Sequence, residues 1–163
     1  MSIQGEGRRR LVVVGNGMAG IRTVEEILAR APGRFQITVF GAEPHPNYNR
    51  IMLSPVLAGE KRFAEIVLND LDWYAQNGIE LITGERVTEV DREARFVTGE
   101  HGTTRPYDAL LLATGSDPFV IPVPGAGLEG VVTFRDLADV EKMLAAAGRG
   151  GPAVVIGGGL LGL

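Results

Sequence analysis

The sequence contains no cysteine and only two histidines among its 163 residues. Without cysteine, this stretch offers no disulfide, no thiol nucleophile and no thiolate ligand for an iron–sulfur cluster. The same absence excludes enzymes that use a redox-active cysteine in this part of the chain. His45 and His101 lie far apart in polar loop sequence, without neighbours that indicate a metal site. We therefore predict neither a metal centre nor cysteine chemistry here.

The sequence also lacks a long apolar run and an excess of positive charge. No stretch approaches the roughly 20 apolar residues that span a bilayer, and no signal-peptide pattern opens the chain. The net charge is −4, and the only basic run is Arg8-Arg9-Arg10. Three arginines fall short of a nucleic-acid-binding patch. We expect a cytoplasmic protein whose partners are neither nucleic acid nor membrane.

Two glycine-rich segments, which we call the first and second fingerprints, share one pattern. The first, 15–20 (GNGMAG), follows the apolar run 11–14, and the second, 157–162 (GGGLLG), follows the apolar run 153–156. Each pattern predicts a buried parallel strand, a tight turn and a helix N-terminus that binds a dinucleotide pyrophosphate. Two such sites indicate a flavin and a nicotinamide nucleotide. No helix sequence follows the second, so we expect the front part of a larger flavoprotein.

Each position of the first fingerprint has an expected role. Gly15 allows the tight turn, Gly17 lets the phosphate approach the backbone, and Gly20 lets the helix lie close to the strand. Met18, Ala19 and Gly20 supply helix N-terminal N–H groups for the anion. A purely structural turn is the competing interpretation.

The remaining pattern predicts an α/β fold, a Rossmann-like domain with a parallel sheet and a small antiparallel meander. Expected strands are 10–14, 36–40, 79–82, 107–113 and 153–156. Expected helices are 18–30, 71–77 and one through 147 that Asp136 caps, and the meander covers 87–90 and 95–98. Residues 41–56 are expected to form a loop too long for a simple connector.

The loop after the second strand carries the candidate polar contacts. A nucleotide-binding fold is expected to place an acidic residue directly after this strand for the adenosine ribose, but Gly41 stands there and Glu43 follows two residues later. Glu43 is either the ribose ligand or a solvated carboxylate. Arg50 is either a partner of a pyrophosphate or flavin, or a surface arginine, and Ser54 is a possible donor beside it.

One further strand end completes the set of candidates. Ala113, Thr114 and Gly115 end a buried strand at the edge where parallel sheets gather ligands, and they are either a cofactor wall or a plain strand end. No arrangement of acid–base or nucleophilic residues is present. We predict no catalytic residue, since a bound cofactor carries hydride chemistry itself.

Four segments together resemble a known family. They are LVVVGNGMAG, TVFGAEPHPNYNRIMLS, YDALLLATGS and VVIGGGLLGL. This succession is similar to the FAD- and NAD(P)-dependent pyridine nucleotide reductases, over nearly the whole chain. The stretches 44–60 and 66–74 look most like the N-terminal part of the large subunit of NAD(P)H-dependent nitrite reductase.

The resemblance implies a domain organisation and a set of contacts. Residues 1–150 would form an FAD-binding domain that lacks its C-terminal segment, and 151–163 the first strand and glycine turn of an NAD(P)-binding domain. FAD would contact Gly15, Gly17, Gly20, Arg50, the Val87 backbone, Ala113–Gly115 and, as a weaker candidate, Arg135; NAD(P)H would contact Gly157, Gly159 and Gly162.

The resemblance further implies hydride transfer from NAD(P)H to FAD, and then electron transfer to a siroheme and iron–sulfur module of the same protein that reduces nitrite. This chain alone is not expected to reduce nitrite. A rubredoxin or ferredoxin reductase, an NADH oxidase, and a non-catalytic nucleotide-binding fragment are the alternatives, and a homodimer is left open. Two residues depart from the related patterns: Pro55 stands where ferredoxin reductases have lysine, and Gly41 replaces the usual acid.

Overall fold

The computed structural model describes residues 7–159, which divide into two compact units. The first unit consists of residues 7–49 and 67–115, and the second of residues 50–66 and 116–159. The chain passes from one unit to the other three times, at 49–50, 66–67 and 115–116. Each unit is therefore assembled from two separate stretches of sequence and is described by itself.

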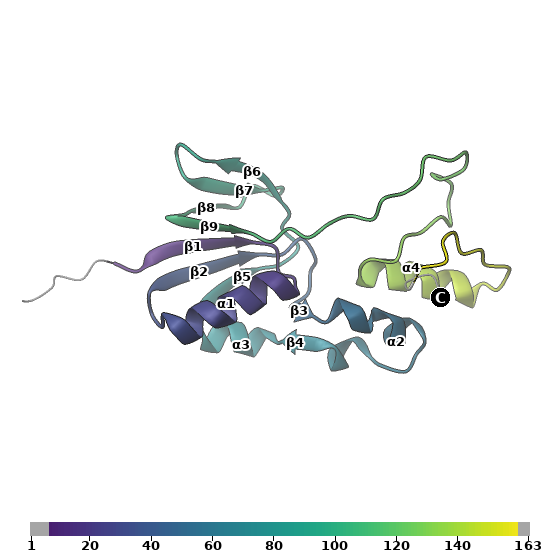
Figure 1. Ribbon diagram of the computed structural model, residues 1–163, viewed down its shortest axis with the longest axis horizontal. Helices are drawn as coiled ribbons and strands as arrows, with labels where there is room; N and C mark the ends of the chain where they lie inside the picture. The colour runs from purple at the N-terminus through teal and green to yellow at the C-terminus, as the bar shows by residue number, and fades with distance from the viewer. Residues whose placement is uncertain (1–6, 160–163) are drawn as a thin grey trace, which may run out of the picture. The chain divides into compact units, whose positions relative to one another are not determined.

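The first unit is built on a four-stranded parallel sheet (Figure 1). Its strands are β1 (Arg9–Val14), β2 (Phe35–Phe40), β5 (Ile79–Ile82) and β9 (Ala109–Leu112), in the order β5-β2-β1-β9. Val14 is in register with Phe40 on one side and with Leu112 on the other, and Phe40 is in register with Ile82. All four strands therefore end in one row, which we call the strand-end row.

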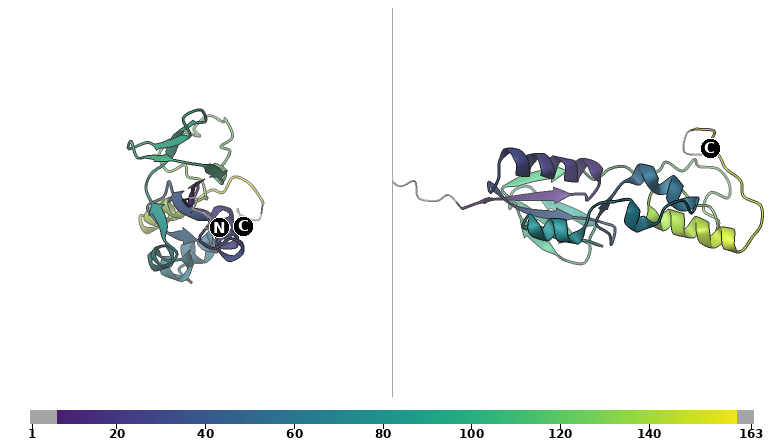
Figure 2. Two further views of the ribbon diagram at one scale, coloured as in Figure 1. Left: turned by 90° about the vertical axis from the view of Figure 1, so that its left-hand side faces the viewer. Right: turned by 90° about the horizontal axis from the view of Figure 1, so that it is seen from below.

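Alternate residues of the central strands build two separate cores. Leu11, Val13, Ile37 and Val39 point to the face covered by α1 (Met18–Arg30) and α3 (Leu71–Gln76), where Ile21, Val24 and Tyr74 are buried. Val12, Val14 and Phe40 point to the opposite face, against Val97 and Tyr107. That face carries the antiparallel meander β6 (Val87–Asp91), β7 (Phe96–Gly99) and β8 (Thr104–Pro106) (Figures 1 and 2).

The predicted β1-α1-β2 unit is confirmed, and so is the α/β fold class. Helix α1 buries Gly20, Ile21 and Val24 on one stripe, as the spacing of its apolar residues predicts. Asp70 caps α3 by accepting a hydrogen bond from the Trp73 N–H at 2.8 Å. The positions of capping residues and glycines in the sequence therefore indicate where these helices begin and end.

The second unit contains short helices around α4 (Leu137–Gly148). They are two 3₁₀ turns, η1 (Arg50–Met52) and η2 (Phe63–Glu65), and the helix α2 (Leu53–Leu57). Helix α2 packs against α4, and the buried side chains Leu53, Leu137 and Val140 lie on these two helices. Asp136 caps α4, as predicted, by accepting from the Asp139 N–H at 2.9 Å.

The segment 41–56 is not a continuous loop. It contains β3 (Asn47–Tyr48), η1 and the start of α2, and β3 pairs with β4 (Val67–Asn69) in an antiparallel ribbon within the first unit. Helix α2 tolerates Pro55 because a proline in the first turn interrupts no intrahelical hydrogen bond.

The predicted strand 107–113 is confirmed as β9, although the strand is shorter, at Ala109–Leu112. Residues 104–106 before it form β8 of the meander, so the chain changes sheets between β8 and β9. The switch is held at Asp108, whose carboxylate accepts from the Arg10 N–H at 2.7 Å. Residues 107 and 108 make this change of sheet, so the parallel strand begins two residues later than predicted.

The predicted strand 153–156 is absent from the structure. No described residue pairs with this segment, and Val154, Val155 and Ile156 are exposed. A strand needs a hydrogen-bonded neighbour. The assignment of 1–150 and 151–163 to two domains stays a prediction. Among residues 7–159, no helix combines the length and apolar composition that crossing a lipid bilayer requires.

We expect Val39→Ala to lower the free energy of unfolding by about 2 kcal/mol, because Val39 is fully buried between the sheet and α1. The matched control is Val154→Ala, at a side chain that is 85% exposed, which should change stability by less than about 0.5 kcal/mol. Urea unfolding of both variants measures the difference. Equal midpoints for the two variants would contradict the assigned core.

Candidate functional site: the carboxyl edge of the parallel sheet

The strand-end row brings the first fingerprint and residues 113–115 together. The Gly15 N–H donates to the Phe40 carbonyl at 2.9 Å, and the Ala113 N–H donates to the Val14 carbonyl at 2.8 Å. A Cβ on Gly15 would lie 2.1 Å from the Ala113 carbonyl oxygen, and Gly15 has a φ of +115°. Position 15 therefore excludes every side chain. The backbones of Gly15 and Ala113 are in contact, so both segments lie at the same edge of the candidate site.

Helix α1 begins directly behind this contact, with its N-terminus unblocked by side chains. Gly17 is the N-cap in an extended conformation, no side chain caps the helix, and its first turn holds no acidic residue. A Cβ on Gly17 would meet nothing within 4 Å, whereas one on Gly20 would lie 2.6 Å from the Gly15 carbonyl oxygen. The backbone is thus tightly packed at Gly20 and open at Gly17. This edge has the room and the N–H donors that an anion needs.

Gly41 lies where an acidic residue is expected, and Asn16 occupies the adjacent space. A Cβ on the buried Gly41 would lie 3.0 Å from the Asn16 Cβ. The Asn16 amide donates to the His45 carbonyl at 3.2 Å and accepts from the Tyr74 hydroxyl at 2.6 Å. Burial raises the pKa of Tyr74 to about 12, so this hydroxyl stays a donor. Asn16 thereby ties the fingerprint turn to the loop after β2 and to α3.

Glu43 lies in the same loop with its carboxylate oriented by a neighbour. The Tyr48 hydroxyl donates to Glu43 Oε2 at 2.6 Å, and the Glu43 carbonyl accepts from the Gly84 N–H at 3.0 Å. Tyr48 is buried and Glu43 is half-buried. The carboxylate is therefore held near the strand-end row, one loop away from the fingerprint turn. Its predicted ribose contact stays a prediction.

The loop between β5 and β6 contains a buried carboxylate that the sequence analysis did not single out. Glu85 accepts from the His101 N–H at 3.0 Å, and its Oε2 lies 2.8 Å from His101 Nδ1. The Glu85 N–H donates to the Gly41 carbonyl at 2.9 Å, two residues before Val87. Burial opposes ionisation, but the hydrogen bonds from His101 and the Thr103 backbone outweigh it and lower the pKa of Glu85. His101 thus attaches the meander to the loop before β6. Residues 85 and 101 are too far apart in the sequence for a local pattern to indicate their contact.

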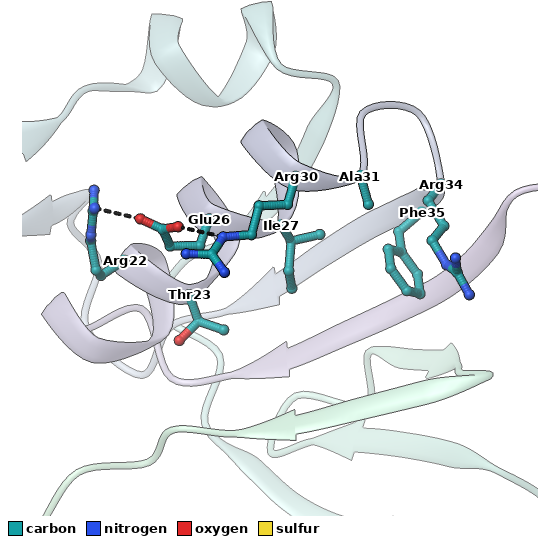
Figure 3. Close-up of a pocket in the computed structure, with 8 residues that line it drawn as sticks. All are labelled: Arg22, Thr23, Glu26, Ile27, Arg30, Ala31, Arg34 and Phe35. Atoms are coloured by element: carbon teal, nitrogen blue, oxygen red, sulfur yellow. Dashed lines mark hydrogen bonds and ion pairs between the residues drawn. The ribbon is translucent and has the colours of Figure 1, made fainter.

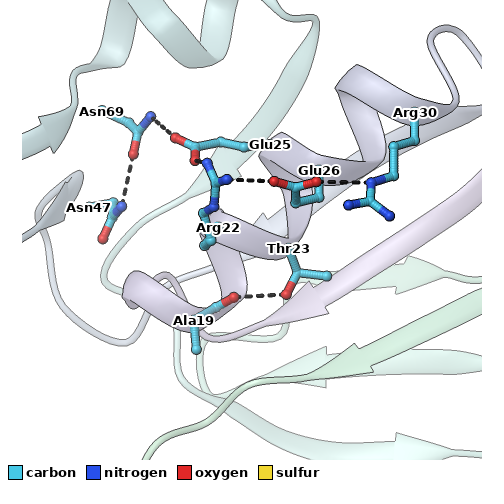
Figure 4. Close-up of polar contacts among 8 residues, drawn as sticks. All are labelled: Ala19, Arg22, Thr23, Glu25, Glu26, Arg30, Asn47 and Asn69. Carbon is cyan, nitrogen blue, oxygen red and sulfur yellow. Dashed lines mark hydrogen bonds and ion pairs between the residues drawn. The ribbon is translucent and has the colours of Figure 1, made fainter.

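Polar side chains also attach the β3–β4 ribbon to α1 (Figure 4). The buried Asn47 donates to Asn69 Oδ1 at 2.8 Å, and Asn69 donates to Glu25 Oε1 at 3.0 Å. Asn69 is the main cause of the lowered pKa of Glu25, with Arg22 adding to it against burial. The figure shows the chain of contacts continuing through Arg22 along the outside of the helix. This ribbon is where the chain leaves and re-enters the first unit.

The other predicted contacts lie in the second unit. Arg50 Nη1 donates to the Arg135 carbonyl at 3.1 Å, which brings together two candidates that are 85 positions apart. Ser54 is exposed on α2. Gly157 and Gly159 are exposed beyond α4, and Gly162 lies outside the described residues. The second fingerprint therefore has no structured site among the described residues.

A shallow hollow on the outside of α1 lies away from the strand-end row (Figure 3). Its lining comes from the exposed side of α1 and from residues before and within β2, including Ala31, Arg34 and Phe35. Arg22 and Arg30 both pair with Glu26 across it. Both arginines of the helix that line the hollow are thus paired with one carboxylate, and the predicted residues lie elsewhere.

Comparison with known proteins identifies the family. A family model described as pyridine nucleotide-disulphide oxidoreductase matches residues 9–163. The chain belongs to this family. None of its 163 residues is a cysteine, although the family's name refers to a disulphide.

The most informative relatives are much longer than this chain. A Bacillus subtilis (strain 168) protein named NAD(P)H nitrite reductase is 57% identical over 157 residues, which are 96% of this chain and 20% of the relative. The ferredoxin reductase component of a chlorobenzene dioxygenase from Cupriavidus sp. (strain PS12) is 35% identical, covering 93% of this chain and 37% of that protein. The chain therefore spans between a fifth and two fifths of these relatives.

A solved structure gives the same fold. The NADH:rubredoxin oxidoreductase from Clostridium acetobutylicum superposes with a TM-score of 0.84 at 30% sequence identity, covering 95% of this chain and 40% of that one. The α/β architecture predicted from the sequence is thus the architecture of a pyridine nucleotide oxidoreductase.

We expect Gly15→Ala and Gly17→Ala to differ sharply in stability. The added Cβ at position 15 would collide with the Ala113 carbonyl at a positive φ, which should cost at least ~3 kcal/mol of unfolding free energy. At position 17 the Cβ enters open space in an extended backbone, so the change should stay within ~1 kcal/mol. Thermal and urea unfolding measure both. A stable Gly15→Ala chain would refute the close contact.

We expect the Glu85–His101 contact to stabilise the fold mainly above the ordinary glutamate pKa of about 4.3. Because the pKa of Glu85 is lowered on folding, its stabilisation is complete above that pH and is lost as the pH falls through the lower folded value. Glu85→Gln should therefore be less stable than the parent chain at pH 7, with the gap closing in acid. Urea midpoints against pH, with the exposed Glu89→Gln as control, measure this. A gap that is independent of pH would contradict it.

Proposed function

We propose that this chain binds FAD and forms the flavin-binding part of an NAD(P)H-dependent oxidoreductase. The observation that carries the proposal is the uncapped N-terminus of α1 at the strand-end row, open at Gly17 and in backbone contact with Ala113 through Gly15. Membership of the pyridine nucleotide-disulphide oxidoreductase family supports the same assignment. The residues present fit an elongated anionic nucleotide lying across this edge.

Each group at this edge of the sheet then binds one part of FAD. The N–H groups of Met18, Ala19 and Gly20 bind the pyrophosphate, and the partial positive charge of the helix N-terminus favours it. Glu43, oriented by Tyr48, accepts from the adenosine ribose hydroxyls. The Val87 backbone contacts the adenine, and Ala113–Gly115 lie along the cofactor. Bound FAD supplies the hydride and electron chemistry, so that the protein orients it and excludes water.

We assign Arg50 to the flavin or its pyrophosphate, with Ser54 and Arg135 as lesser contacts. A guanidinium offers planar, permanently charged donors that suit either group. NAD(P)H is the proposed hydride donor, bound through Gly157, Gly159 and Gly162 of the second fingerprint. The support for this contact is the glycine pattern of the second fingerprint and the family to which the chain belongs.

The proposed final acceptor is a siroheme and iron–sulfur module that reduces nitrite. The 57% identity to the Bacillus subtilis NAD(P)H nitrite reductase supports this choice. Transfer to a ferredoxin or rubredoxin is the second candidate, supported by the ferredoxin reductase relative and by the rubredoxin oxidoreductase fold. The cytoplasm, where NAD(P)H is supplied, is the proposed location.

Titration of the purified chain with FAD tests the proposal. We expect quenching of flavin fluorescence that saturates at about one FAD per chain, and at least ~10-fold weaker binding by Gly17→Ala, whose Cβ would enter the path of the pyrophosphate. Gly127→Ala, whose Cβ would likewise meet nothing within 4 Å and whose backbone has no positive φ, serves as the control outside the fingerprint. A folded parent chain that leaves the FAD spectrum unchanged would overturn the proposal.

A further inference from the structure

A buried carboxylate at the start of α4 has no part in the function proposed so far. Asp139 is 7% exposed and lies three residues after the N-cap Asp136. Its Oδ2 accepts from the Thr133 hydroxyl at 2.9 Å and from the Arg135 N–H at 2.9 Å, and its Oδ1 lies 3.6 Å from Lys142 Nζ. Burying a carboxylate is costly unless hydrogen bonds compensate it. These contacts supply that compensation, and the two from Thr133 and Arg135 fix the turn before the helix.

The turn is fixed on both sides of Arg135. Asp139 holds the Arg135 N–H, and Asp136 is held in turn because its carboxylate accepts from the Asp139 N–H at 2.9 Å. With the N–H fixed and the following residue locked as the N-cap, the direction of the Arg135 carbonyl is set. Capping of α4 requires Asp136 alone. The second carboxylate therefore goes beyond what the helix needs.

The Arg135 carbonyl accepts a hydrogen bond from Arg50. Arg50 Nη1 donates to it at 3.1 Å, and Arg50 lies in η1 at the start of the separate stretch 50–66. An arginine side chain has many rotamers, and ordering it costs conformational entropy. A carbonyl in a fixed direction selects the rotamers that reach it. The chain of contacts runs from Asp139 through the Arg135 backbone to the Arg50 guanidinium.

We propose that Asp139 is a positioning residue for Arg50: it fixes the Arg135 carbonyl that holds the guanidinium ready for an anionic cofactor. The part that concerns the cofactor rests on the proposed function, in which Arg50 contacts FAD. Asp139 itself touches no ligand. Its carboxylate acts as a hydrogen-bond acceptor, so that an asparagine, which keeps an acceptor oxygen, should largely replace it.

Two variants and one control separate positioning from a structural role. Asp139→Ala should weaken FAD binding about tenfold, while Asp139→Asn should stay within about threefold of the parent chain. Val140→Ala, at the neighbouring and fully buried position of α4, should lower the unfolding midpoint but leave the FAD dissociation constant unchanged. An Asp139→Ala chain that binds FAD like the parent, or a Val140→Ala chain that loses as much affinity, overturns the proposal.

A double-mutant cycle tests whether Asp139 acts through Arg50. In an Arg50→Ala background, Asp139→Ala should cause no further loss of FAD affinity, because the group that it positions is already absent. Independent, additive losses would overturn the proposal.

A measurement without FAD keeps the inference distinct from the proposed function. Nitrogen-15 NMR of the Arg50 guanidinium should show restricted rotation in the parent chain and in Asp139→Asn, and faster rotation in Asp139→Ala. If the parent chain fails to bind FAD, the proposed function fails and this measurement still decides the positioning. Equal rotation in the parent and in Asp139→Ala would refute it.

Discussion

The common end point of the four parallel strands is the constraint on which the rest of the structure depends. Because Leu112, Val14, Phe40 and Ile82 are in register, the loops that follow them leave the sheet from one row. Glycines where those loops begin let the backbones approach to contact distance, as at Gly15 and Ala113. The sheet thereby brings the helix N-terminus, the Glu43 loop and the Glu85 loop to one edge, where side-chain contacts of Asn16 and Glu85 then hold them.

Each face of the sheet contributes hydrogen bonds that hold the loops at this edge. On one face, Tyr74 of α3 reaches the fingerprint turn through Asn16, so that the core and the loop after β2 share one hydrogen-bond network. On the other face, the meander returns to the edge through His101 and Glu85. Both contacts replace loop flexibility with fixed geometry. Preorganised donors of this kind bind a ligand without a large ordering cost.

The sequence predicted the parts of the fold that have local patterns. The β1-α1-β2 unit was predicted from the spacing of apolar residues and the positions of glycines. The start of α4 was predicted from Asp136, which is its N-cap. The ribbon β3–β4 was missed because its two short strands bury asparagines, which read as loop residues. Glu85 was missed because its partner His101 lies 16 positions away in the sequence. Asp139 was missed because an irregular turn, which has no fixed sequence pattern, brings Thr133 and Arg135 to its carboxylate. The segment 153–156 was predicted as a strand but does not form one, since an apolar run alone does not provide a neighbouring strand.

The position of β1 between β2 and β9 also has a consequence for synthesis. β2 follows β1 after about 20 residues of helix and turn, but β9 begins only at Ala109. While the ribosome makes the intervening chain, the other edge of β1 carries unpaired N–H and C=O groups beside the apolar side chains of Leu11–Val14. Such long-range pairing folds late and leaves a nascent chain prone to aggregation. Growth temperature and chaperone supply should therefore affect the yield of this protein during its synthesis.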